Sequence, residues 1–165
     1  GSGTIGLLTA QFALALGAEV NVIGTDETTL VLARDLGVNK VFNDISQLSN
    51  GYDAIVDATN STDVPSQTLS FVEPGGRVVL IGVSGEPSNI DSRSIVLKDV
   101  TVVGILSASP GLRGAIEFYS SGKVDPRPIV AATVSLKEAA LVLSGGRPEG
   151  SGIGPKFHID PRVNL

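Results

Sequence analysis

The sequence opens with Gly1-Ser2-Gly3-Thr4-Ile5-Gly6, and this stretch decides how the rest of the chain is interpreted. The glycines follow the pattern G-x-G-x-x-G, and an apolar, alanine-rich segment runs on from them to Leu16. Gly1 permits a tight turn out of a strand, Gly3 lets a phosphate group approach the backbone, and Gly6 lets the following helix pack closely on a sheet. The free N–H groups at the start of that helix favour an anion. The stretch therefore predicts a binding site for the pyrophosphate of a dinucleotide.

A second predicted strand supports this interpretation. Residues 18–23 form a β-rich run about twenty residues after the opening turn, where a dinucleotide-binding unit places the strand that reaches the ribose. Gly24, Thr25 and Asp26 follow the strand directly. Asp26 also suits the N-cap of the next helix. We therefore expect these three residues to lie beside the ribose of the same ligand.

Composition limits the classes of protein that remain. A chain of 165 residues is long enough for one domain with a core, and 42% apolar with 18% charged residues is typical of a globular protein. The net charge of −5 argues against a nucleic-acid partner, and the most apolar segment, residues 5–16, is too short to cross a bilayer. The absence of cysteine excludes disulfides and thiolate metal ligands from this segment. We expect a cytoplasmic protein that binds neither nucleic acid nor membrane.

The chain alternates between predicted strands and helices, which predicts an α/β fold with a doubly wound parallel sheet, the Rossmann fold. We assign residues 1–144 to a dinucleotide-binding domain and residues 145–165 to a C-terminal loop with a closing strand. Residues 73–76 are predicted as a turn by their composition. The predicted strands are residues 18–23, 40–43, 52–58, 77–83, 100–106, 129–134 and 156–159, and the predicted helices are residues 5–16, 27–36, 64–71, 112–119 and 136–143.

The turn at Gly1 needs a strand before it, yet no residue precedes it, and the sequence contains no methionine. Both observations predict a segment of a longer chain, and therefore a fold truncated before its first strand. That strand would lie at the centre of the sheet, so we expect the isolated segment to fold poorly.

Ligands bind open α/β sheets at the carboxyl ends of the strands, and three further predicted strands end in residues suited to that position. Together with the opening turn and the ribose loop, these strand ends complete the predicted site. The predicted cofactor-binding residues are Gly1, Gly3, Thr4, Ile5, Gly6, Gly24, Thr25, Asp26, Ala58, Thr59, Ile81, Gly82, Val83 and Leu106.

Several segments resemble the cofactor half of the medium-chain dehydrogenase/reductase family, which includes the zinc-containing alcohol and polyol dehydrogenases. The resemblance covers nearly the whole chain in the expected order. The segments that carry it are Gly1–Gly6, Val56-Asp57-Ala58-Thr59, Pro74-Gly75-Gly76 with residues 78–83, residues 95–104, Ser121–Pro126 and Gly154–Pro161.

The resemblance implies the cofactor-binding part of an NAD(P)-dependent oxidoreductase that interconverts an alcohol or polyol with its ketone or aldehyde. In the zinc-containing members an upstream catalytic domain holds the zinc, so this segment would contain no catalytic or metal-binding residue. The backbone near Ala58 and Thr59 would meet the adenine-side ribose, and the backbone of residues 81–83 the nicotinamide carboxamide. The resemblance also implies a homodimer or homotetramer, with residues 94–97 or the following strand pairing with a second subunit.

The choice between NAD and NADP depends on the ribose loop. By resemblance, members that prefer NAD carry an acid at the position of Gly24, and its loss would make room for a 2′-phosphate. No lysine or arginine follows between Thr25 and Thr29, whereas Asp26 and Glu27 do. Because two carboxylates would repel that phosphate, we favour NAD, with Thr25 or Asp26 contacting the ribose.

Alternatives remain open at this point. A non-catalytic NAD-binding regulatory domain, a zinc-free quinone or enoyl reductase of the same family, and a methyltransferase can each carry a similar glycine turn. Tyr119 and Lys123 have the Y-x-x-x-K spacing of short-chain dehydrogenases, but Gly122 predicts a helix end between them. His158 is the only histidine and has no second metal ligand beside it.

Overall fold

The computed structural model describes residues 1–107 and 109–163. The helices are α1 (Thr4–Ala15), α2 (Glu27–Asp35), α3 (Val64–Phe71), α4 (Ser92–Leu97), α5 (Leu112–Ser120) and α6 (Leu136–Leu143). The strands are β1 (Asn21–Ile23), β2 (Lys40–Phe42), β3 (Tyr52–Asp57), β4 (Val72–Leu80), β5 (Thr101–Gly104), β6 (Val130–Val134) and β7 (Lys156–Ile159). Short 3₁₀ turns are η1 (Ile45–Gln47), η2 (Ser109–Gly111) and η3 (Arg127–Ile129).

All the strand pairs that the described residues form are parallel. β1 pairs with β2, β4 lies between β3 and β5, and β6 pairs with β7. Parallel neighbours need crossover connections, and helices supply them here, with α2 between β1 and β2 and α3 between β3 and β4. The predicted α/β architecture of parallel strands alternating with helices is therefore confirmed.

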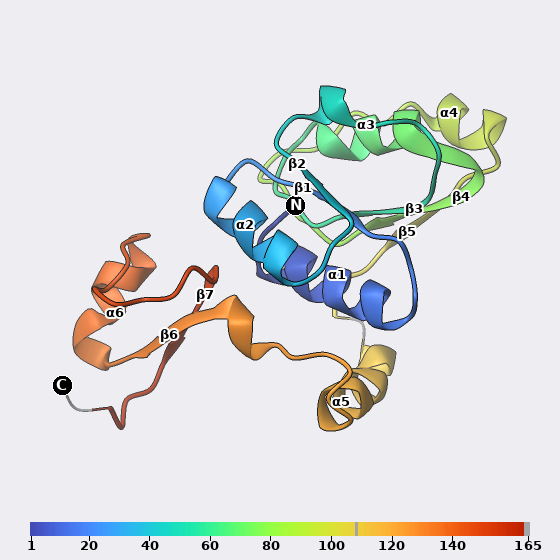
Figure 1. Cartoon of the computed structure of the whole chain (residues 1–165). Coiled ribbons are helices and arrows are strands. Elements are labelled where there is room, and N and C mark those ends of the chain that lie inside the picture. The colour runs from blue at the N-terminus through green and yellow to red at the C-terminus, as the bar shows by residue number, and fades with distance from the viewer. Residues whose placement is uncertain (108, 164–165) are drawn as a thin grey trace.

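Helices cover both faces of the strands. Figure 1 shows α3 and α4 on one side of β3, β4 and β5, with α1 and α2 on the other. Two buried clusters correspond to these layers. The first joins α1, β1, α2 and η3 through Leu7, Ala10, Val22, Leu30, Leu32, Ala33, Val38 and Ile129, and the second joins α3, β4 and the start of β5 through Leu69, Val72, Val78 and Val100.

Local sequence explains the helix boundaries. Asp26 caps α2 by accepting a hydrogen bond from the backbone N–H of Thr28 at 2.8 Å, and Pro65 stands in the first turn of α3. At α6, the Glu138 side chain accepts a hydrogen bond from the Ser135 N–H at 3.1 Å. The unit of β6, α6 and β7 lies beside the main body (Figure 1, orange to red), and Ile129 of η3 anchors its start in the first buried cluster.

Two local predictions are wrong. Residues 73–76 are not a separate turn before a strand but lie within β4, as a bulge between the pairs Tyr52–Val72 and Ala54–Arg77. Gly75, at φ +76°, donates its N–H from this bulge to the Lys98 carbonyl at 2.7 Å. Residues 94–97, offered as one of two edge segments for pairing with a second subunit, are not a strand but belong to α4, whose N-cap Asp91 accepts a hydrogen bond from the Arg93 N–H.

β1 and β3 form no ladder with each other in the described residues. At their amino ends, the Asn21 amide donates to the Tyr52 hydroxyl at 3.5 Å. Within the described part of the chain, none of the helices combines the length and apolar character needed to cross a membrane.

Candidate functional site

The opening turn, the ends of β3 and β4, and the start of α1 meet at the carboxyl edge of the strands. A Cβ on Gly6 would overlap the Gly1 carbonyl oxygen and lie 3.7 Å from the Ala58 side chain. A Cβ on Gly82 would overlap the Thr59 carbonyl oxygen and lie 2.6 Å from its nitrogen. Because these contacts are with backbone atoms, only glycine fits at both positions. The structure therefore brings together the strand ends that the sequence marked as a site.

The start of α1 is open toward this edge. Gly3 is the N-cap, it is exposed, and a Cβ placed on it would meet no atom within 4 Å. No side chain caps the helix, and its first turn carries no acidic residue. The N–H groups of the first turn have no carbonyl partner within a helix, so they are available to an anion at this point.

Asp57 organises the strand ends, although the sequence did not single it out as a site residue. It is 3% exposed, and its Oδ1 accepts the Thr59 N–H at 2.9 Å. Its backbone carbonyl accepts the N–H groups of Ile81 and Gly82 at 2.9 and 3.0 Å. One buried residue thus holds the loops after β3 and β4 against each other. The sequence signals were an acid at the end of a β-rich run and its place in the resembling segment Val56-Asp57-Ala58-Thr59.

The ribose loop after β1 is fixed by hydrogen bonds to its neighbours. Asp26 accepts the Thr28 N–H through Oδ1, and its backbone carbonyl accepts the Thr29 hydroxyl at 2.9 Å. The Thr29 hydroxyl also lies 2.6 Å from the Ser2 hydroxyl, between two residues that are 6% and 7% exposed. The expected N-cap role of Asp26 is therefore confirmed, and the loop is joined to the opening turn.

Other predicted residues are placed beside the same edge but project outward. The exposed fractions are 50% for Ile5, 72% for Val83 and 88% for Leu106. Val83 and Leu106 follow the ends of the neighbouring strands β4 and β5. An apolar side chain so exposed at a site rim is free to contact a ligand or another surface.

The Y-x-x-x-K pair does not form the one-turn helical arrangement that short-chain chemistry requires. α5 ends at Ser120, and Gly122 has φ +70°, so Lys123 lies beyond the helix. Its ammonium sits over the Phe118 ring, 5.7 Å from the centroid. The predicted helix end at Gly122 is confirmed.

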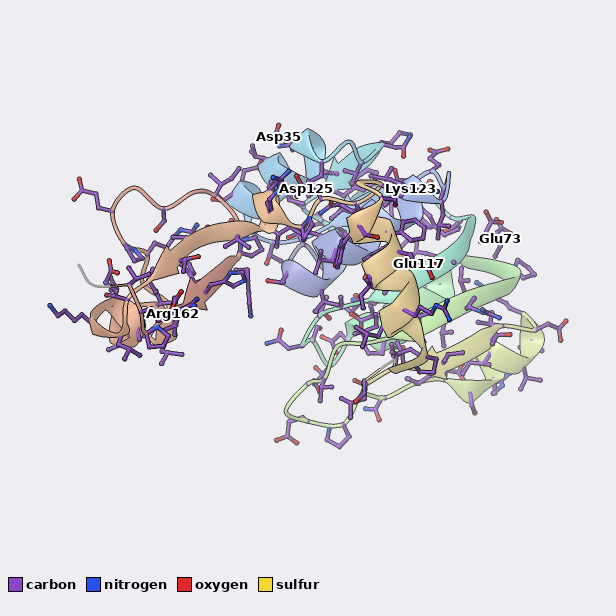
Figure 2. All side chains as sticks on the ribbon, turned by 90° about the horizontal axis from the view of Figure 1, so that it is seen from below. Asp35, Glu73, Glu117, Lys123, Asp125 and Arg162 are labelled. Atoms are coloured by element: carbon purple, nitrogen blue, oxygen red, sulfur yellow. The ribbon has the colours of Figure 1, made fainter. Side chains whose placement is uncertain are left out.

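Charged side chains are spread over the surface, with Glu73 and Arg162 at opposite ends of Figure 2. Four arginines form exposed ion pairs with local carboxylates, and these pairs are Arg34–Glu27, Arg113–Glu117, Arg127–Asp125 and Arg162–Asp160. Among the described residues, no three His, Asp or Glu side chains gather where they could hold a metal ion.

The match to the family model described as zinc-binding dehydrogenase spans residues 4–121. The chain belongs to this family. The matched range contains all the predicted cofactor-binding residues except Gly1 and Gly3.

Two kinds of relative agree with this assignment. The chain is 27% identical to L-idonate 5-dehydrogenase from Vitis vinifera over 96% of its own length and 48% of that protein. Its fold is similar to a protein from Sinorhizobium meliloti described as a zinc-binding dehydrogenase bound to NADP (TM-score 0.82, 24% identity, 97% and 50% of the two chains). It is also similar to an alcohol dehydrogenase from Escherichia coli complexed with NADH (TM-score 0.80, 21% identity, 92% and 48%). The chain therefore spans about half the length of the relatives it matches.

Proposed function

We propose that this chain is the cofactor-binding part of an NAD(P)-dependent oxidoreductase that interconverts an alcohol or polyol with its ketone or aldehyde by hydride transfer. The observation that carries the proposal is the start of α1 at Gly3, which is open, has no side-chain cap and lies beside the end of β3, where Gly1 and Gly6 approach Ala58. The dehydrogenase names of relatives, and the NADH and NADP in similar structures, support it.

The residues present fit a nicotinamide dinucleotide. The N–H groups of Thr4, Ile5 and Gly6 would hold the pyrophosphate, because they end a helix dipole and have no acidic side chain beside them. The loop from Gly24 to Asp26 would hold the adenosine ribose, with Ala58 and Thr59 on its other side. Ile81, Gly82, Val83 and Leu106 would line the nicotinamide end. When bound, the nicotinamide supplies the hydride acceptor or donor, and the chain's own contribution is to position it.

NAD is the favoured cofactor. Asp26 has one carboxylate oxygen in its N-cap bond, and Glu27 beside it is bonded to Arg34 at 2.9 Å. Both carboxylates are exposed at the ribose loop, where a 2′-phosphate would add two negative charges. The second oxygen of Asp26 is suited to accept a ribose hydroxyl instead.

The remaining parts of the proposal concern the whole protein. Zinc, if the enzyme uses it, is assigned to a domain outside this chain. We assign the protein to the cytoplasm and to a homodimer or homotetramer. Because residues 94–97 are helical in the structure, the strand after them is the candidate for pairing with a second copy. That strand, β5, is an edge strand among the described residues.

The decisive test is Gly3→Val in the full-length protein. The backbone at Gly3 is extended (φ −76°, ψ −174°) with no atom within 4 Å of an added Cβ, so valine should lower the melting temperature only slightly, by its weaker preference for the N-cap. The same side chain would occupy the space proposed for the pyrophosphate, and we expect NADH affinity by calorimetry to fall by roughly tenfold or more. Unchanged NADH affinity in Gly3→Val would refute the cofactor site.

Turnover separates the enzyme from its alternatives. We expect the wild-type protein to oxidise members of a panel of alcohols and polyols with NAD. Nucleotide binding without any turnover would instead indicate a regulatory domain. If the protein reduces quinones or enoyl substrates, and a metal chelator does not change the rate, the result would indicate a zinc-free reductase.

A further inference from the structure

An asparagine followed by a glycine stands just before β3. Asn50-Gly51 is the only such pair in the chain, and both residues are exposed. The backbone nitrogen of the residue after an asparagine can attack the side-chain carbonyl carbon and close a succinimide ring. A side chain on that residue obstructs the approach, and glycine has none. This pair is therefore better suited to the reaction than any other asparagine in the chain.

The local backbone leaves the two reacting groups accessible. Gly51 has φ +105°, a conformation that a residue with a side chain rarely adopts. Residues 48–51 belong to no helix or strand. The Asn50 side chain makes no hydrogen bond to any residue that the structure describes, so it is free to turn toward the Gly51 nitrogen.

One hydrogen bond of the fold opposes the reaction. The Gly51 N–H donates to the carbonyl of Phe71, the last residue of α3, at 3.1 Å. The nitrogen must give up this proton when it attacks, so the bond has to open first. Such an opening is local, because it involves an exposed loop without other regular structure. The reaction therefore depends on how often this one bond opens.

We propose that Asn50 is a site of spontaneous deamidation whose rate is set by the hydrogen bond between Gly51 and Phe71. The Gly51 nitrogen forms a bond to the Asn50 side-chain carbonyl carbon, and its proton leaves with the side-chain nitrogen as ammonia. Water then opens the ring at one of its two carbonyls, and the product is aspartate or isoaspartate. Water is the only co-reactant, and the inference does not depend on the proposed function.

The products change the junction between α3 and β3. Tyr52, which begins β3, pairs with Val72 directly after α3. Isoaspartate carries the main chain through its side-chain carbons, which adds one methylene group just before this pair. Both products also place a carboxylate near the negative end of the α3 dipole, where Phe71 accepts its bond. We therefore expect both products to loosen the junction, and isoaspartate to do so more than aspartate.

The test is to incubate the full-length protein at mildly alkaline pH and to follow each asparagine by peptide mass spectrometry, with isoaspartate measured by enzymatic carboxyl methylation. Asn60 is the internal control, because it is also exposed and the Ser61 N–H is also bonded, to the Thr59 hydroxyl at 3.2 Å. Serine differs from Gly51 in having a side chain, so we expect Asn50 to deamidate roughly tenfold faster than Asn60.

The role of the hydrogen bond is tested with a peptide of residues 45–56, in which the Gly51 N–H has no partner. Asn50 in the folded protein should deamidate roughly fivefold more slowly than in the peptide, because one hydrogen bond must open first. The modified protein, separated by ion exchange, should show faster amide hydrogen exchange in α3 than the untreated protein. Asn50→Gln, incubated in the same way, should show no change, because glutamine would have to close a larger ring.

Each part of the proposal has a result that overturns it. Deamidation of Asn50 no faster than that of Asn60 would overturn the site. Equal rates in the peptide and the folded protein would overturn the role of the bond to Phe71, and unchanged exchange in α3 would overturn the effect on the junction. None of these results bears on the NADH titration that tests the proposed function, so the two proposals can fail separately.

Discussion

Asp57 provides the sharpest test of how the site is held together. The residue is 3% exposed, its carboxylate accepts the Thr59 N–H at 2.9 Å, and its backbone carbonyl accepts two N–H groups from the residues after β4. We expect Asp57→Ala to release the loop that begins at Ala58, because alanine removes the carboxylate that accepts the Thr59 N–H. The backbone bonds to Ile81 and Gly82 can persist in the variant.

The magnitude follows from the hydrogen bond that is lost. Leaving a partly buried N–H without a partner costs about 1–3 kcal/mol, and a value near 2 corresponds to a roughly 30-fold rise in a dissociation constant. Asp57→Asn keeps an oxygen acceptor of the same shape at the same position. We therefore expect it to bind NADH within about threefold of the wild-type protein, since only the charge is lost.

Calorimetric titration of the full-length variants with NADH is the appropriate assay. Amide hydrogen exchange in the peptide that contains residues 57–62 should report the same loosening without any ligand, and faster exchange is expected in Asp57→Ala only. The reasoning would be refuted by normal NADH affinity in Asp57→Ala. It would equally be refuted if Asp57→Asn were as defective as Asp57→Ala.

Three further predictions concern the elements around the site. Lys98→Met should speed amide hydrogen exchange in α3 by about tenfold or more. The Lys98 ammonium donates to the carbonyls of Leu69 and Val72 at 2.7 and 3.1 Å, and methionine removes both hydrogen bonds. Lys98→Arg, which keeps a donor, should speed the exchange less. Gly82→Ala should lower the melting temperature while Gly114→Ala should not, because only the first methyl overlaps backbone; equal melting temperatures would contradict the close approach at Thr59. The Arg127 side chain holds the pKa of the exposed Asp125 carboxyl at about 2, so the favourable charge of Asp125 is present above its ordinary pKa and is lost as pH falls through about 2. The NMR chemical shift of the Asp125 carboxyl carbon should therefore stay constant between pH 6 and about 4. In the Arg127→Gln variant the Asp125 carboxyl should begin to titrate within that interval.

Local chemistry let the sequence predict most elements of the fold. The ranges of α3, α6 and β7 agree with the structure residue for residue, because a proline, a capping box or a short alternating run fixes each of them locally. α1 and α2 end within about a residue of the expected positions, which is the usual scatter of helix ends. The glycine pattern correctly indicated where a helix begins at the edge of the sheet.

The errors arose where contacts distant in sequence decide the conformation. Residues 73–76 look like a turn, yet pairing with β3 and the bond from Gly75 to the Lys98 carbonyl incorporate them into β4. Residues 94–97 are the exception, because a local signal, the Asp91 N-cap, begins a short helix there. Asp57 could not be recognised as the organiser of the site, because its partners come from two different loops.

The sequence by itself determined the alternation of strands and helices, the position of the glycine turn and the family resemblance, since each depends on residues close together in the chain. Only the tertiary structure decided that the Ser2 hydroxyl lies against the Thr29 hydroxyl beside the ribose loop and that Asp57 joins the ends of β3 and β4. The physical reason is that both depend on van der Waals overlap and hydrogen-bond distance between segments some twenty residues or more apart, which no local pattern specifies.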